Sequence, residues 1–188
     1  MFNSLTTSLA RSTVCIVFSW ALAIILPSCT GGADNVADSK VQGNSWTVLF
    51  YMMGDSDLEK FLMSDLFELK DVVGDKNTNI VVLIDRSEEF YDGEVLGLGN
   101  FSDTKLLSFG EDGIVPLDYA IDLSGEKNMG TSETLESFIA FSLTEFPADN
   151  TALILWDHGG GWKGMGPDVT NGFDLLTLPE LRRAVIGG

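Results

Sequence analysis

The sequence predicts an α/β protein in which helices cover both faces of a mostly parallel sheet. Three runs of apolar, β-branched and aromatic residues indicate buried strands, at residues 47–53, 79–85 and 151–156. Segments with the apolar spacing of amphipathic helices lie between these runs, and such alternation is typical of layered α/β folds. Ligands of these folds bind beyond the carboxyl ends of the strands, so we expect the functional site at that edge.

The first predicted strand and helix occupy residues 47–74. The strand sequence TVLFYMM is apolar throughout, which indicates burial on both faces. Gly54 interrupts it, and Ser56 with Glu59 three residues later has the spacing of a helix capping box. Apolar residues then recur at helical spacing until Gly74, which ends the predicted helix.

The middle of the chain contains the second strand and the second helix. After the strand at 79–85, residues 86–103 are acidic and glycine-containing, and we expect them to be irregular. Residues 104–109 are predicted to form a short strand. Ser132 is the expected cap of the second helix, which ends before Pro147.

The last predicted elements follow the third strand, at residues 151–156. Residues 163–176 are expected to form a loop, and the spacing of Thr177 and Glu180 predicts a capping box for a helix over 178–186. A helix in this architecture normally leads into another strand. We therefore expect the sheet to be incomplete at the C-terminus.

The N-terminal 45 residues are predicted to direct export. Arg11 is the single charged residue among the first 33, and the apolar run that follows it is too short to span a bilayer, so we interpret residues 1–28 as a signal peptide. The sequence Leu-Pro-Ser before Cys29 resembles a lipobox, which would make Cys29 the lipidated first residue of the mature protein. Ordinary secretory cleavage nearby is the alternative. Residues 29–45 are small and polar, as in a flexible tether.

Composition excludes several functions for the predicted domain. Both cysteines, Cys15 and Cys29, precede residue 46, so the domain contains no disulfide, thiolate zinc site or cysteine nucleophile of its own. The chain has 28 acidic and 11 basic residues and a formal charge of −17, which argues against nucleic-acid binding. A solvated acidic surface is the simplest interpretation, and affinity for cationic substrates or Ca²⁺ is the alternative.

The most distinctive segment is ILWDHGGGW, residues 154–162. His158 is the single histidine of the chain, and histidine is the side chain best suited to exchange protons near neutral pH. It follows a predicted strand and precedes glycines whose N–H groups can approach an oxyanion closely. We therefore interpret His158 as a catalytic acid or base, with a structural loop histidine as the alternative.

Other patterns give weaker hypotheses. Asp55 and Asp57 are expected mainly to stabilise the first helix through its dipole, with substrate or ion contact as a secondary role. Asp157, His158 and Asp168 would need to converge to bind a metal, and the acidic residues of 88–94 lack the spacing of a Ca²⁺-binding EF-hand loop. We therefore predict no metal site. The glycines match a dinucleotide fingerprint, but the Met-Gly-Pro after them cannot continue the required helix.

Four blocks of the sequence, in this order, resemble the clostripain family of cysteine peptidases. They are WTVLFYMMGDSDLE at 46–59, Asn-Met-Gly at 128–130 with Phe-Pro-Ala at 146–148, LILWDHGGGW at 153–162 and TLPELRRAV at 177–185. The resemblance implies a caspase-like three-layer α/β/α sandwich and a catalytic His–Cys dyad. It also implies peptide or protein substrates cleaved after Arg or Lys, and Ca²⁺ dependence in some members, so Ca²⁺ is a candidate cofactor.

In this resemblance His158 is the general acid/base and the Gly159 N–H contributes to the oxyanion hole. The family's nucleophile lies on a strand after the TLPELRRA helix, beyond these 188 residues. We therefore interpret residues 46–188 as the N-terminal part of the peptidase domain of an exported lipoprotein on a bacterial cell envelope, inactive by itself. The alternative is a non-catalytic binding lipoprotein, or a decayed gene product, with the same fold.

Overall fold

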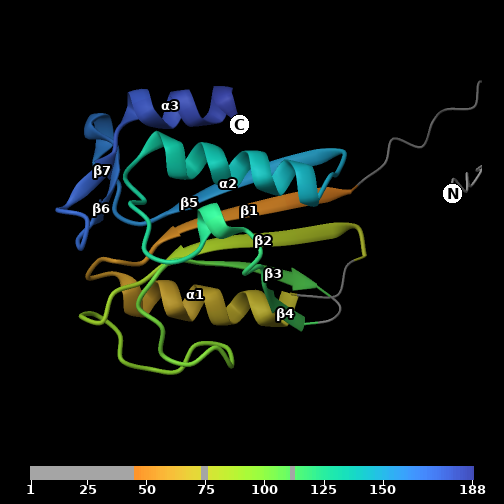
Figure 1. Cartoon of the computed structure of the whole chain (residues 1–188), viewed down its shortest axis with the longest axis horizontal. Coiled ribbons are helices and arrows are strands. Elements are labelled where there is room, and N and C mark those ends of the chain that lie inside the picture. The colour runs from red at the N-terminus through yellow and green to blue at the C-terminus, as the bar shows by residue number, and fades with distance from the viewer. Residues whose placement is uncertain (1–44, 73–75, 111–112) are drawn as a thin grey trace, which may run out of the picture. The chain divides into compact units, whose positions relative to one another are not determined.

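The computed structural model describes residues 45–72, 76–110 and 113–188 (Figure 1). The expected signal peptide, Cys29 and the predicted tether up to residue 44 lie outside these described residues. Within the described ranges, no helix has both the length and the apolar character that crossing a lipid bilayer requires.

A five-stranded mixed sheet forms the centre of the domain. Its strands are β1 (Trp46–Met53), β2 (Thr78–Asp85), β3 (Lys105–Gly110), β4 (Gly113–Pro116) and β5 (Asn150–Trp156). They lie in the order β4-β3-β2-β1-β5. The central strand β1 is parallel to both β2 and β5, whereas β3 and β4 are antiparallel to their neighbours. The carboxyl ends of β1, β2 and β5 therefore meet at one edge of the sheet.

Helices cover both faces of this sheet. Helix α1 (Glu59–Val72) lies on one face, and α2 (Ser132–Glu145) and α3 (Leu178–Gly187) lie on the other (Figure 1). Successive residues of a strand point to opposite faces, so β1 contributes Tyr51 to the core beneath α2 and Met52 to the core beneath α1. The expected α/β/α sandwich is confirmed. In the five-stranded sheet, antiparallel pairing is limited to the pairs β2–β3 and β3–β4.

The segment expected to be a loop after residue 163 contains a small hairpin instead. A single 3₁₀ turn, η2 (Gly161–Lys163), leads to β6 (Met165–Asp168), which pairs with β7 (Asp174–Leu176). Strands of four and three residues are too short for an apolar alternation to reveal them, and β4 was missed for the same reason. Gly164 has a positive φ of 125°, and a Cβ there would collide with the Leu176 carbonyl oxygen, so only glycine fits.

The predicted capping box at the start of α1 is wrong. The Glu59 carboxylate pairs with Arg86 at 2.6 Å instead of bonding the backbone of Ser56. The Ser56 N–H donates to the Gly54 carbonyl, and its hydroxyl donates to Asp157 Oδ1 at 3.0 Å. Arg86 has replaced the local partner of Glu59, whereas the Ser56 hydroxyl oxygen still accepts locally from the Leu58 N–H at 3.4 Å.

The other helix starts follow their sequence signals more closely. Thr131, not Ser132, is the cap of α2, and its hydroxyl oxygen accepts a hydrogen bond from the Thr134 N–H at 3.3 Å. The capping box of Thr177 and Glu180 at the start of α3 is confirmed. These caps satisfy N–H groups that have no partner within the helix.

The irregular stretch after β2 is fixed by a buried arginine. Arg86 is fully buried, and besides Glu59 it donates to the Phe101 carbonyl at 2.5 Å and the Tyr91 carbonyl at 2.9 Å. Val95, within the same stretch, is also fully buried. The expected lack of regular structure is confirmed for residues 86–103, and the segment forms part of the core beneath α1.

Candidate active site around His158

His158 lies directly after β5, at the edge of the sheet where the parallel strands end. Its Nε2 atom is 2.8 Å from Oδ1 of Asp57, which belongs to the segment between β1 and α1. The His158 side chain is 44% exposed and that of Asp57 76% exposed. Because β1 and β5 are adjacent and parallel, the segments that follow them are neighbours, which brings these two residues together.

Asp57 holds the imidazole of His158 through a hydrogen bond. The hydrogen bond with His158 lowers the pKa of the Asp57 carboxyl below its ordinary value. Since Nε2 is engaged by Asp57, Nδ1 is the ring nitrogen left to exchange a proton with a reacting group.

Asp157 holds the backbone on which His158 is mounted. Its Oδ1 atom accepts hydrogen bonds from the His158 N–H at 2.6 Å and from the Ser56 hydroxyl at 3.0 Å. Burial raises the pKa of Asp157 to about 6, although both hydrogen bonds oppose that shift. Through these hydrogen bonds, Asp157 links the segment that follows β5 to the segment that follows β1, next to His158.

Among the glycines after His158, the Gly159 N–H is the first that is left available to a ligand. The segment 158–160 pairs in antiparallel fashion with 164–166 through two hydrogen bonds, Gly166 N–H to the His158 carbonyl and Gly160 N–H to the Gly164 carbonyl. Gly159 lies between these bonds, so its own N–H is not used by the pair. A Cβ on Gly159 would meet no atom within 4 Å, so the space beside its Cα is open.

A second group at the same edge consists of three buried carboxylates. Asp55, Asp85 and Asp168 follow or end β1, β2 and β6, and one oxygen of each lies within 4.8 Å of the others. Asp55 was expected to stabilise α1, but its Oδ2 accepts from both the N–H and the hydroxyl of Thr170, each at 2.6 Å. Asp168, which we had considered together with Asp157 as a metal ligand, belongs to this group instead.

Sequence reasoning missed Asp85, although a signal was present. Its position at the carboxyl end of a buried parallel strand matches that of the acidic residues after β1. Burial raises the pKa of Asp85 to about 8, with further increases from neighbouring acids, while the Thr104 hydroxyl opposes the shift. Burial also raises the pKa of Asp168. Negative charge is therefore costly here unless a cation or a proton offsets it.

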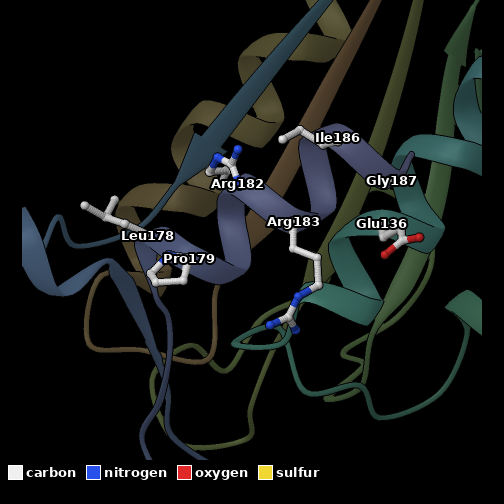
Figure 2. A pocket seen from close by; sticks show the side chains of 7 residues that line it. All are labelled: Glu136, Leu178, Pro179, Arg182, Arg183, Ile186 and Gly187. Carbon is white, nitrogen blue, oxygen red and sulfur yellow. The ribbon is translucent and has the colours of Figure 1, made fainter.

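The pocket shown in Figure 2 lies apart from this constellation. It is lined by α3 residues and by Glu136 of α2, and Arg182 and Arg183 project from α3 in different directions. Arg183 reaches the Ser132 hydroxyl at the start of α2, at 2.9 Å. None of the lining residues belongs to the His158 group or to the three carboxylates.

The fold and the site define a caspase-like α/β/α domain with a histidine at a strand end. The sequence profile of the clostripain family, Peptidase C11, matches residues 50–188, and the chain belongs to this family of cysteine proteases. Clostripain from Hathewaya histolytica is 33% identical over 132 residues, which cover 65% of this chain and 25% of that protein.

A solved structure supports the fold. A secreted C11 cysteine protease from Bacteroides thetaiotaomicron, in complex with an irreversible peptide inhibitor, superposes with a TM-score of 0.58 at 23% identity. The match covers 77% of this chain and 39% of that one. The chain therefore spans a quarter of the curated clostripain and well under half of the structural relative.

Proposed function

We propose that this chain is the histidine-bearing part of an exported cysteine endopeptidase that cleaves after Arg or Lys. The observation that carries the proposal is the hydrogen bond of His158 to Asp57 beside the Gly159 N–H, within a member of the clostripain family. The strongly acidic composition supports a preference for basic substrates.

His158 would move protons in both halves of the reaction. Through Nδ1 it accepts the proton of a cysteine thiol, and the thiolate attacks the scissile carbonyl carbon. The same imidazole then donates that proton to the leaving amine as the C–N bond breaks, which leaves a thioester on the cysteine. In the second half the imidazole accepts a proton from water, whose oxygen attacks the thioester, and the cysteine sulfur leaves and recovers the proton. Asp57 holds the ring through Nε2, and the Gly159 N–H donates to the oxygen that becomes negative.

The nucleophile in this proposal comes from outside the 188 residues. Cys15 and Cys29 both precede β1, within the segment we assign to the signal peptide and its cleavage site. We therefore expect the purified 188-residue chain to show no amidolysis. Activity of this chain against an Arg or Lys substrate would contradict the proposal.

The decisive experiment uses the complete product of the gene, expressed from codon 1 to its stop codon. We expect it to hydrolyse peptide anilides with Arg or Lys before the scissile bond, and not those with a neutral residue there. His158→Ala should lower kcat by at least about a thousandfold, because the dyad loses its acid/base. Lys163→Ala, on the exposed turn nearby, is the matched control and should retain activity. Undiminished activity of His158→Ala would exclude the assigned role.

We also propose export and lipidation at Cys29. The relative from Bacteroides thetaiotaomicron is a secreted protein, which supports export, and the lipobox-like Leu-Pro-Ser-Cys supports a lipid anchor. Radiolabelled palmitate should be incorporated in a bacterial host, and Cys29→Ser should abolish the label. If the chain is cleaved before a residue other than Cys29 and no palmitate is incorporated, the protein is exported without a lipid anchor.

The alternative function is binding without catalysis. Trp162, four residues after His158 in the sequence, is 82% exposed, and this exposed aromatic side chain favours a contact surface. If the complete gene product lacks a cysteine after Gly188, this alternative replaces the peptidase proposal. A partner would then bind wild type and His158→Ala equally well, and lose affinity on Trp162→Ala.

A further inference from the structure

We propose that Asp55, Asp85 and Asp168 form a buried binding site for one divalent cation, with Ca²⁺ as the preferred ion. This site is separate from the proposed dyad and does not depend on the peptidase proposal, because ion binding is measured on the chain directly.

The first argument is that two carboxylate oxygens have no partner. Asp55 is 1% exposed and Asp85 is fully buried, yet Asp55 Oδ1 and Asp85 Oδ2 have no hydrogen-bond donor among the described residues. Buried polar atoms are nearly always satisfied, and a buried carboxylate oxygen without a partner is expensive. The second oxygen of each group is held by Thr170 or Thr104, which fixes the carboxylates in place.

The third ligand is equally well positioned. Asp168 is 1% exposed; its Oδ2 accepts from the Met129 N–H at 2.7 Å and its Oδ1 from the Asn171 N–H at 3.1 Å. The Asn171 side-chain amide also donates to Oδ2, at 3.4 Å, so Oδ2 has two donors and Oδ1 has one. A carboxylate oxygen has two lone pairs, so Oδ1 retains one for a cation.

The spacing and the chemistry of the donors suit a hard cation. All donors are carboxylate oxygens, the ligands that Ca²⁺ and Mg²⁺ prefer over N or S donors. Ca²⁺ binds oxygen at about 2.3–2.6 Å, so oxygens up to about 5 Å apart can share one ion. The three oxygens lie within 4.8 Å of one another, a separation that one Ca²⁺ ion can span. Ca²⁺ also accepts irregular oxygen geometry, whereas Mg²⁺ requires a near-ideal octahedron.

The charge of the site has no counterpart in the protein. In the described part of the chain, no Lys, Arg or His forms an ion pair with Asp55, Asp85 or Asp168. Arg86, adjacent to Asp85, directs its guanidinium to Glu59. Buried charges are normally paired or bound to metal, so the structure leaves the role of counter-ion to a cation.

A cation here would join three segments that carry the proposed active site. Asp55 lies two residues before Asp57, and the Val169 N–H donates to the Asp55 carbonyl at 3.2 Å. Asp168 ends β6, whose first residues pair with the segment of His158. Ion binding should therefore stabilise the geometry around His158 as well as the ion site itself.

The test is the melting temperature and the binding heat of the purified 188-residue chain titrated with CaCl₂ after treatment with a chelator. We expect a saturable stabilisation with one ion per chain. Asp85→Asn should weaken Ca²⁺ binding by at least about tenfold, because affinity follows the charge of the ligands. Asp71→Asn, the same change on the exposed surface of α1, is the matched control and should bind as wild type does.

A spectroscopic measurement covers the case in which Asp85→Asn fails to fold. Tb³⁺ bound to the wild-type chain should luminesce on excitation of Tyr51, whose pKa the nearby Asp85 and Asp168 help to raise, and Ca²⁺ should displace it. No saturable heat, no thermal shift and no displaceable luminescence would overturn the proposal. The same holds if Asp85→Asn binds like the control, or if Mg²⁺ binds as tightly as Ca²⁺. A shared proton would then be what neutralises the three carboxylates.

Discussion

Replacing Arg86 with methionine should destabilise the domain strongly, because the arginine connects α1 to the long segment after β2. The side chain is fully buried, as is that of its partner Glu59. Its guanidinium also donates to the Phe101 and Tyr91 carbonyls and to Asn100 Oδ1, at 2.5, 2.9 and 3.2 Å. Methionine fills much of the same volume but donates no hydrogen bond.

The magnitude follows from what the substitution leaves behind. Removing one partner of a buried ion pair costs about 3–5 kcal/mol, since the other charge remains buried without compensation. We expect Arg86→Met to lose about that much unfolding free energy at pH 8. Replacing both Glu59 and Arg86 with methionine should cost less than the sum of the two single changes, because no isolated charge remains.

The cost should also depend on pH, with a defined sign. Burial raises the pKa of Glu59 to about 7 even though Arg86 opposes the shift, and without Arg86 it rises further. The folded state then binds the proton more tightly than the unfolded state, so the variant gains stability as pH falls through this pKa. We expect the deficit of Arg86→Met relative to wild type to shrink between pH 8 and pH 5.5.

Urea denaturation followed by tryptophan fluorescence measures these differences. Lys105→Met is the matched control, because Lys105 pairs with Asp103 at a partly exposed site where such pairs contribute at most about 1 kcal/mol. A loss below about 1 kcal/mol for Arg86→Met, or a loss equal to that of the control at every pH, would refute the assigned role of the buried pair.

Three further predictions concern the site and its supports. Burial raises the pKa of Asp157 to about 6, so the wild type loses stability as this group ionises. The stability of Asp157→Asn relative to wild type should therefore be about 1–2 kcal/mol higher at pH 7.5 than at pH 4.5 in denaturation curves. A difference independent of pH would contradict this. Gly164→Ala should lower the unfolding free energy by at least about 2 kcal/mol, because φ at Gly164 is 125° and a Cβ there would collide with backbone atoms. Gly110→Ala should lower it by less than about 1 kcal/mol, because Gly110 has open space around it and no positive φ. Similar melting temperatures for the two variants would be evidence against this prediction. In the complete gene product, Asp57→Asn should lower kcat about tenfold with little change in KM, because the substitution removes the carboxylate that holds the imidazole of His158. A change confined to KM would instead assign Asp57 to substrate binding.

The strands that carry the site could be predicted because their signal is local. The apolar runs identified β1, β2 and β5 to within one residue, and the parallel pairing of β1 with β5 follows from the α/β pattern. The proximity of the segments that hold Asp57 and His158 is a consequence of that pairing.

Long-range competition explains what could not be predicted. Ser56 with Glu59 has the same spacing as Thr177 with Glu180, yet only the second pair forms a capping box. The first is lost because Arg86, distant in sequence, binds Glu59. The proximity of the three buried aspartates could not be predicted for a related reason, because it depends on where β6 ends in space relative to β1 and β2.

The strand order has a practical consequence for handling this protein. The two edges of the sheet differ: β4 has four residues and ends at Pro116, whereas β5 has seven, rich in Leu, Ile and Trp, and pairs on one side with β1 among the described strands. A long apolar edge is a template for pairing with another chain, and proline and short length blunt that tendency. Preparations of the 188-residue chain should therefore self-associate through β5 as concentration rises, and dilute samples are the appropriate ones for every measurement of its stability.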